Sequence, residues 1–169
     1  NVFSLIPKGT PMYDDAVFVA DRAVDYASFL LSSGVLDRLP DPPPGQKVGE
    51  IGYHDPCHLS GTPGKGPEAR EVLSRAVGPA FAEMAGADLC CGYGGTFNVR
   101  DYPTSARIGG NKVTVAARGG TKVISTACSG CVLQVRDMVA RTDTSLRVVH
   151  IAELVHQALF RGDGDAPRR

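Results

Sequence analysis

The chain has 169 residues, of which 43% are hydrophobic and 21% are charged, a composition typical of one globular domain with or without an appendage. Lys and Arg together number 18, as do Asp and Glu, so the formal net charge is zero; this argues against a nucleic-acid-binding protein, which usually carries a basic excess. No apolar run reaches the length of a membrane span, and no secretory signal is visible.

The first 45 residues predict an N-terminal part made of a loop, one helix and a stiff linker. Residues 1–11 contain proline and glycine at several positions, which predicts a loop. Residues 12–33 carry alanine, valine and leucine at helical spacing with charged residues on the other face, so they predict one long helix with Gly34 as its C-terminal cap. Residues 41–45 read Asp-Pro-Pro-Pro-Gly, which is typical of a semi-rigid linker. We therefore expect a separate domain over residues 46–160.

Strands and helices alternate through residues 46–160. The alternation predicts an α/β fold, with a mostly parallel, Rossmann-like sheet and helices on both faces. Residues 161–169 are polar without periodicity and predict a flexible tail. The expected strands cover residues 48–54, 80–84, 122–126 and 146–149, and the expected helices cover residues 67–77, 103–117, 132–140 and 151–159.

The five cysteines are Cys57, the adjacent pair Cys90 and Cys91, and the pair Cys128 and Cys131. Without a secretory signal we expect a reducing compartment, where grouped cysteines are more often metal ligands or catalytic groups than disulfides. A single zinc takes four ligands, and a disulfide scaffold would leave one thiol over. A polynuclear iron–sulfur cluster can use all five, because several irons share the ligands and two adjacent cysteines can bind two neighbouring irons.

Each group of cysteines follows one of the expected strands. In an open parallel sheet, ligands bind at the carboxyl ends of the strands, so we expect the three groups to meet at one edge. Cys128 and Cys131 also fall where a helix begins, and a helix N-terminus favours thiolate over thiol. The groups follow the strands at residues 48–54, 80–84 and 122–126, in chain order.

Residues between and beside the cysteines are candidates to contact the cluster without binding its metal. Gly92, Gly94 and Gly95 predict a loop whose backbone approaches the cluster and directs N–H groups at its sulfurs, which tunes the reduction potential. Ser129 and Gly130 keep the turn between the last two cysteines tight.

Two histidines, His54 and His58, flank the first cysteine. Either could bind metal, but a hydrogen bond to sulfur or a structural role is favoured over ligation. Scattered cations could steer an acidic redox partner, although such residues more often form a solvated face. These cations are Arg100, Arg107, Lys112, Arg118 and Lys122.

Three segments together resemble a known family. Residues 53–59 read Tyr-His-Asp-Pro-Cys-His-Leu, residues 90–97 read Cys-Cys-Gly-Tyr-Gly-Gly-Thr-Phe, and residues 127–131 read Ala-Cys-Ser-Gly-Cys. Over roughly residues 47–155 the chain resembles the cysteine-rich CCG domain. That domain occurs in the iron–sulfur subunits of glycolate oxidase, L-lactate oxidation complexes, anaerobic glycerol-3-phosphate dehydrogenase and heterodisulfide reductase. The chain departs from the family in a slightly longer gap before the last cysteine pair, and in carrying one motif where two are usual.

The resemblance implies a non-cubane [4Fe-4S]-type cluster bound by all five cysteines. It also implies an electron-transfer module for a flavin dehydrogenase that oxidises a 2-hydroxy acid of the glycolate or lactate type and passes electrons toward quinone. That role predicts a cytoplasmic protein, peripheral at the inner face of the membrane.

Two alternatives stay open: a heterodisulfide-reductase-like domain that cleaves a disulfide at its cluster, and a zinc-stabilised interaction domain without redox activity. Protein prepared in air is expected to lose the cluster and to show free thiols, a disulfide or zinc.

The single motif predicts a partner. The chain starts at Asn1 rather than at methionine, and we interpret it as the C-terminal part of a longer polypeptide whose upstream part carries the other CCG half. We expect the chain to fold by itself, to expose an apolar surface near the cluster where that half packs, and to self-associate through this surface.

Overall fold

The computed structural model describes residues 5–43, 45, 47–60, 65–142 and 144–161. Within them, three short parallel strands form one sheet in the order β1-β2-β3. Gly52 pairs with Ile124, and Ser125 pairs with Val149. The predicted α/β fold with a parallel sheet is therefore confirmed. The strands are β1 (Ile51–Tyr53), β2 (Val123–Thr126) and β3 (Arg147–His150).

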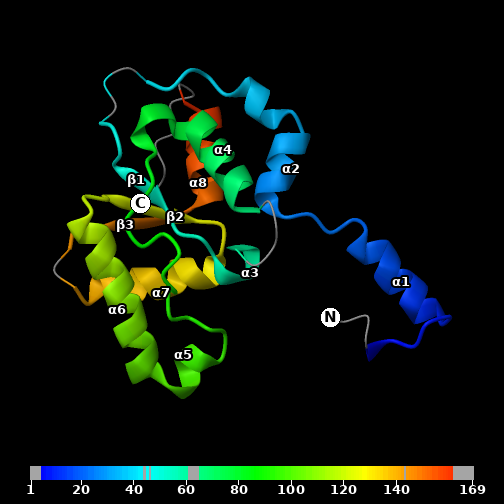
Figure 1. Ribbon diagram of the computed structural model, residues 1–169. Helices are drawn as coiled ribbons and strands as arrows, with labels where there is room; N and C mark the ends of the chain where they lie inside the picture. Colours follow the sequence, from blue (N-terminus) through cyan, green and yellow to red (C-terminus); the bar gives the residue numbers. More distant parts are fainter. Residues whose placement is uncertain (1–4, 44, 46, 61–64, 143, 162–169) are drawn as a thin grey trace.

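Helices cover both faces of this sheet (Figure 1). On one face, α4 (Lys65–Val77) and α8 (Ile151–Leu159) pack together, and α2 (Tyr26–Ser32) packs on α4. On the other face lie α6 (Tyr102–Arg118) and α7 (Ser129–Ala140). A separate hydrophobic cluster fills each layer. The remaining helical elements are α1 (Pro11–Ala20), η2 (Val35–Arg38), α3 (Cys57–Ser60), η3 (Gly78–Ala80) and α5 (Phe97–Arg100).

Two helices start at the carboxyl end of the sheet. The α8 helix follows β3 without a break, and His150 caps it by accepting a hydrogen bond from Ala152 N–H while Glu153 bonds back to the His150 N–H. The α7 helix starts three residues after β2, with Cys128 as its N-cap residue. Strand carboxyl ends and helix N-termini therefore share one edge, as predicted for the site.

The strand expected at residues 80–84 does not form. Residues 78–80 make the short helix η3, and Phe81 makes only an isolated parallel bridge to Ile51. Gly78 and Gly86 both have positive φ angles, 52° and 68°, so the chain turns at each end of a stretch too short for a strand. The second cysteine group therefore reaches the site from a loop and not from a strand.

The long helix expected at residues 12–33 is two helices, α1 and α2. The break falls where Asp25, in an extended conformation, caps α2 by accepting hydrogen bonds from the Ser28 N–H and hydroxyl. A cap inside an apolar periodicity ends one helix and starts another, which the spacing of apolar residues alone does not reveal. Figure 1 shows α1 apart from the body of the molecule, and it has no buried residue.

Other boundaries differ by a few residues: the expected strand at 48–54 covers only 51–53, and α4 begins at Lys65 instead of residue 67. Pro44 of the expected linker and residues 162–169 of the expected tail lie outside the described residues.

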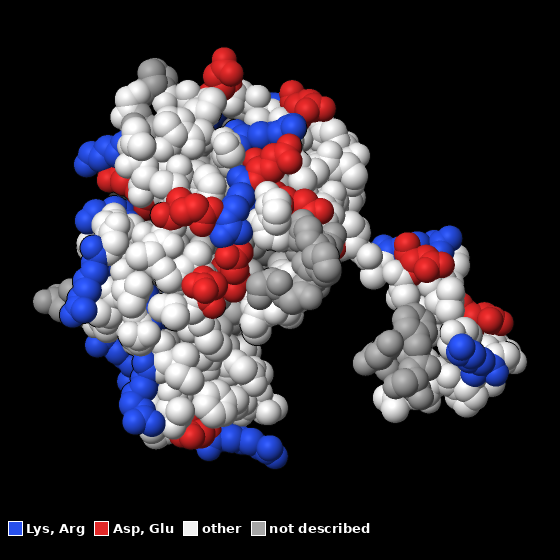
Figure 2. Space-filling view, in the orientation of Figure 1, with Lys and Arg blue, Asp and Glu red and all other residues white. Residues whose placement is uncertain are grey.

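Lys and Arg side chains gather along the edge where α6 lies, and acidic groups cover other parts of the same face (Figure 2). Among the described helices, none combines the length and apolarity needed to cross a membrane.

Candidate metal centre

Two strand ends deliver cysteines to the same edge of the sheet. After β1, His54 pairs through its N–H with Ser125 O at 2.8 Å, which holds the loop to Cys57 against β2. After β2, Cys128 is extended, with φ −121° and ψ 116°, and α7 then places Cys131 in its first turn. The expectation that the last two cysteines lie at a helix N-terminus is therefore confirmed.

The loop before the adjacent cysteine pair is tied to the first of these segments through one carbonyl. Ala87 O accepts a hydrogen bond from Asp55 N–H at 3.0 Å and from His54 Nδ1 at 3.1 Å. Because a carbonyl only accepts, Nδ1 carries a proton, and in a neutral ring Nε2 would then be the unprotonated acceptor. This is the tautomer that a metal-binding histidine needs.

Three side chains meet in the interior beside this carbonyl: His54, Cys91 and Cys131. Their potential ligand atoms lie within 4.8 Å of one another, and each residue is at most 4% exposed. Cys91 Sγ and Cys131 Sγ are 2.9 Å apart, and this hydrogen bond lowers the pKa of Cys91 and raises the pKa of Cys131. His54 Nε2 is buried and has no hydrogen-bond partner among the described residues. A bare imidazole nitrogen and two sheltered sulfurs are donors that suit a metal centre.

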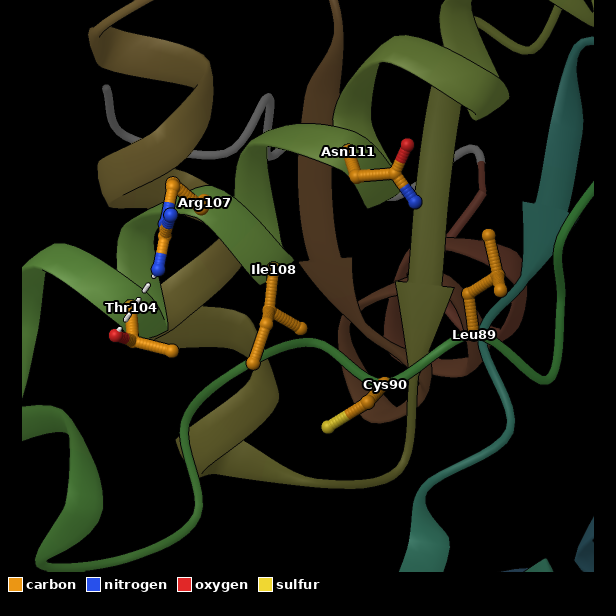
Figure 3. A pocket seen from close by; sticks show the side chains of 6 residues that line it. All are labelled: Leu89, Cys90, Thr104, Arg107, Ile108 and Asn111. Carbon is orange, nitrogen blue, oxygen red and sulfur yellow. Dashed lines mark hydrogen bonds between the residues drawn. The ribbon is translucent and has the colours of Figure 1, made fainter.

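The remaining three thiols lie farther out. Cys128 is half-buried and adds to the rise in the pKa of Cys131, while Cys57 and Cys90 are exposed. Gly92 N–H donates to Cys90 Sγ at 3.3 Å, an N–H···S bond of the kind expected from the glycine loop. Cys90 also lines an open pocket of about 450 Å³ with Ile108 and Arg107 of α6 (Figure 3). Within the described part of the chain, none of the five cysteines forms a disulfide.

The glycine loop is packed against α6 and α7 at positions where no side chain fits. Gly92 has φ +86°, and a Cβ there would lie 2.5 Å from Ser105 O. A Cβ on Gly130, in the first turn of α7, would lie 2.8 Å from the Tyr93 ring. Residues 92–96 form no helix or strand, as predicted. Among the other candidates, Gly94 and Gly95 have positive φ angles, and Ser129 and His58 are exposed.

Comparison with known proteins identifies the family to which this arrangement of residues belongs. Residues 51–136, just over half of the chain, match the family model described as "CCG: Cysteine-rich domain". The chain belongs to the CCG family. The match covers all five cysteines, the glycine loop and the histidines beside Cys57.

Several curated proteins resemble the chain over 103 to 138 residues. Lactate utilization protein A of Bacillus subtilis (strain 168) is 33% identical over 103 residues, which are 61% of this chain and 43% of that protein. The probable glycolate oxidase iron-sulfur subunit of the same strain is 34% identical over 110 residues, 64% of this chain and 25% of that protein. Lactate utilization protein A of Bacillus thuringiensis (strain Al Hakam) is 29% identical over 138 residues, 82% of this chain and 56% of that protein. The chain thus spans about half the length of these relatives, or less.

A buried polar network that was not predicted from the sequence holds the glycine loop, residues 92–96, in place. Ser105 Oγ donates to Gly92 O at 2.7 Å, and Gln134 Nε2 donates to Ser105 Oγ at 3.0 Å. Asn98 Nδ2 donates to Gln134 Oε1 at 2.5 Å, which joins α5, α6 and α7 around the loop. Ser105 and Gln134 are at most 2% exposed. Their helical spacing from apolar core residues was the available signal, since Ser105 lies eight residues before Val113.

An ion pair fixes the other side of the site. Arg70 of α4 binds both carboxylate oxygens of Asp55, each at 2.8 Å, and also pairs with Glu83. The hydrogen bonds from Arg70 lower the pKa of Asp55. Asp55 therefore holds the loop before Cys57 as a charged group paired with Arg70.

Replacing Asp55 with Asn should lower the free energy of unfolding by about 2 kcal/mol at neutral pH, because a bidentate, partly buried charged pair is lost. A carboxyl whose folded pKa is lowered stabilises the protein above its ordinary pKa near 4, and this contribution disappears as the pH falls through the folded value. The difference between wild type and variant, measured by urea unfolding, should therefore shrink below about pH 4. Asp37→Asn is the control, because the Asp37–Arg75 pair is exposed and should change stability by under about 0.5 kcal/mol. Equal losses in both variants, or a difference independent of pH, would contradict this account.

One of the five cations considered for steering a partner is not on the surface. Lys112 is 0% exposed, so its assignment to a solvated face was wrong. The α6 helix turns this position toward the core, between buried Gly109 and Ala116. The other four cations, Arg100, Arg107, Arg118 and Lys122, are exposed.

Proposed function

We propose that the five cysteines hold a polynuclear iron–sulfur cluster of the [4Fe-4S] type, and that the chain is an electron-transfer module of a flavin-linked system oxidising a 2-hydroxy acid. Membership in the CCG family and the names of its relatives, a lactate utilization protein and an iron-sulfur subunit of a probable glycolate oxidase, support this function. The observation that carries it is the convergence of cysteine segments on one sheet edge, with the sulfurs of Cys91 and Cys131 2.9 Å apart in the interior.

The graded burial of the thiols suits electron transfer. A centre held by Cys91 and Cys131 is sheltered on its inner side, and Cys57 and Cys90 leave its outer side near solvent, where a donor can approach. The dipole of α7 and the Gly92 N–H favour thiolate sulfur at this edge. When bound, the cluster would supply one-electron chemistry, and the residues of the chain would set its ligands, its shelter and its potential.

Zinc is the second candidate, and the position of His54 supports it. His54, Cys91 and Cys131 lie together in the interior, and Cys128, which interacts with Cys131, could complete a Cys₃His set, a common structural zinc site. This candidate leaves Cys57 and Cys90 without a role, which is why we favour the cluster. The role in flavin-linked transfer needs its own test.

That test uses anaerobically reconstituted protein and photoreduced FMN as the electron donor. We expect FMN to reduce the centre and to bleach its visible absorption, while lactate or glycolate alone has no effect. Absorption that is unchanged by reduced FMN would overturn the electron-transfer role. If the protein, with excess photoreduced FMN supplying two electrons, instead cleaved an added organic disulfide to two thiols, the heterodisulfide-reductase-like alternative would replace it.

We further propose that the partner is a second CCG module, and that the folding unit expected over residues 46–160 also includes α2, which packs on α4, while α1 is an appendage to it. The grouping of the five cysteines favours a reducing, cytoplasmic location, and electron transfer toward quinone would put the assembly at the inner face of the membrane. The α1 helix exposes Met12, Phe18 and Val19, at 66%, 57% and 64% of their surfaces, and so offers an apolar face to such a module.

In the absence of that module, the chain should self-associate through α1. Replacing Phe18 and Val19 together with Ser should remove the concentration-dependent rise in mass measured by light scattering, because it removes two of the three large apolar side chains that α1 exposes. Replacing Leu133, which is 60% exposed on α7, with Ser is the control and should leave the association unchanged. A wild-type chain that stays monomeric at all concentrations would contradict the proposal.

A further inference from the structure

Lys112 occupies a core position that its charge does not suit. On α6 it shares the inward face with Ser105, Gly109, Val113 and Ala116, and the whole side chain is inaccessible to solvent. A lysine almost never lies fully buried unless its charge is paired, because removing an ammonium from water is costly. A buried ammonium at this position therefore needs an interaction that compensates for its removal from water.

The hydrogen bonds of Lys112 do not by themselves explain its burial. Its Nζ donates to Gly86 O at 2.6 Å and to Ala87 O at 2.9 Å. Both carbonyls have other donors: Gly86 O accepts from Leu89 N–H, and Ala87 O accepts from Asp55 N–H and from the His54 ring. Neither carbonyl would be left without a partner if the ammonium were absent.

No carboxylate within the described part of the chain forms an ion pair with Lys112 Nζ, so its positive charge is not neutralised directly. Burial lowers the pKa of Lys112 to about 8, while Cys91, Asp55, Asp88 and Cys131 act in the opposite direction by their negative charge. The two thiols among these groups are the buried pair of the candidate metal centre. The ammonium and that centre are also joined through a shared atom, since Ala87 O bonds both Lys112 Nζ and the His54 ring.

We propose that Lys112 is the buried counter-charge of the metal centre: its ammonium, fixed on the Gly86 and Ala87 carbonyls behind His54, stabilises the negative charge of the metal-bound thiolates. This inference rests on the proposed metal centre. Thiolates binding a divalent metal or an iron–sulfur cluster leave a net negative charge, and a cation fixed in a poorly polarisable interior interacts with it strongly. Reduction adds one more electron to the same centre, so the ammonium stabilises the reduced state more than the oxidised state.

The test compares Lys112→Met with Lys122→Met in the full chain. The two substitutions remove the same group, but Lys122 is exposed and precedes β2. Titration of the metal-free protein with Co²⁺, followed through the sulfur-to-cobalt absorption, should show about tenfold weaker binding for Lys112→Met and unchanged binding for Lys122→Met. In iron- and sulfide-reconstituted protein, the reduction potential should become more negative in Lys112→Met alone.

A purely structural role for Lys112 makes the opposite prediction. In that case the metal-free Lys112→Met protein would unfold more easily, while its Co²⁺ affinity and potential would match the wild type; this result would overturn the inference. We expect the metal-free variant to be at least as stable as wild type, because the buried charge is gone and both carbonyls keep a donor. Lys112→Gln, which is neutral but still donates a hydrogen bond, should reproduce the Met result and serves if the Met protein does not fold. If the protein binds Co²⁺ but assembles no cluster, the proposed electron-transfer function fails, and the Co²⁺ comparison still decides the role of Lys112.

Discussion

Replacing Cys91 with Ser is expected to abolish assembly of the iron–sulfur cluster. Cys91 is 4% exposed and lies 2.9 Å, sulfur to sulfur, from Cys131, so it is placed to hold the innermost part of the centre. A serine hydroxyl is a much harder and more basic ligand than a thiolate, and it does not replace the soft sulfur that iron–sulfur clusters need. Iron and sulfide content and visible absorption after anaerobic reconstitution would measure the loss.

His58→Ala is the matched control for Cys91→Ser. His58 lies beside Cys57 but is exposed, so its removal should leave cluster content close to wild type. Cys90→Ser should behave like Cys91→Ser, because both members of the adjacent pair are expected ligands. A His58→Ala protein without a cluster, together with a Cys91→Ser protein that keeps one, would show that the proposed ligand set is wrong.

Replacing Gly92 with Ala should cost about 3 kcal/mol in the free energy of unfolding of the metal-free protein. The positive φ angle of 86° costs about 1–2 kcal/mol for a residue with a side chain. The added Cβ would also lie 2.5 Å from Ser105 O, a backbone atom of α6 that moves only with its helix. Urea unfolding would measure the loss.

Gly95→Ala separates these two contributions. Gly95 has a similar φ of 60°, but nothing lies within 4 Å of its added Cβ. Only the backbone strain applies there, so its cost should be about 1 kcal/mol. Equal losses in the free energy of unfolding in the two variants would mean that the packing of the glycine loop against α6 does not contribute to stability.

The fold was predictable where one physical signal acts alone. Strands β2 and β3 are short runs of apolar and β-branched residues between helices, and the alternation identified both them and the parallel sheet. The prediction failed for residues 80–84 because Gly78 and Gly86 turn the chain at both ends of that segment. It also failed at Asp25, where a cap divides one periodicity into two helices.

The candidate site was predictable as a set of residues but not as a geometry. The order of the cysteines and the strand ends indicated the correct edge of the sheet, yet the sequence did not separate the buried thiols of Cys91 and Cys131 from exposed Cys57. It also did not distinguish His54 from His58, because only the loop from residue 86 to 90 supplies the carbonyl that orients the His54 ring. For Lys112, residue type indicated a surface position, whereas helical spacing from Ser105, Gly109 and Ala116 indicated the core.

The iron and sulfide content of the chain after anaerobic reconstitution tests the central claim most directly. The account predicts several irons per chain with a matching amount of acid-labile sulfide, and a brown protein that bleaches in air. One zinc per chain, with no capacity for iron or sulfide under the same conditions, would contradict it and would leave the Cys₃His site as the function of this edge.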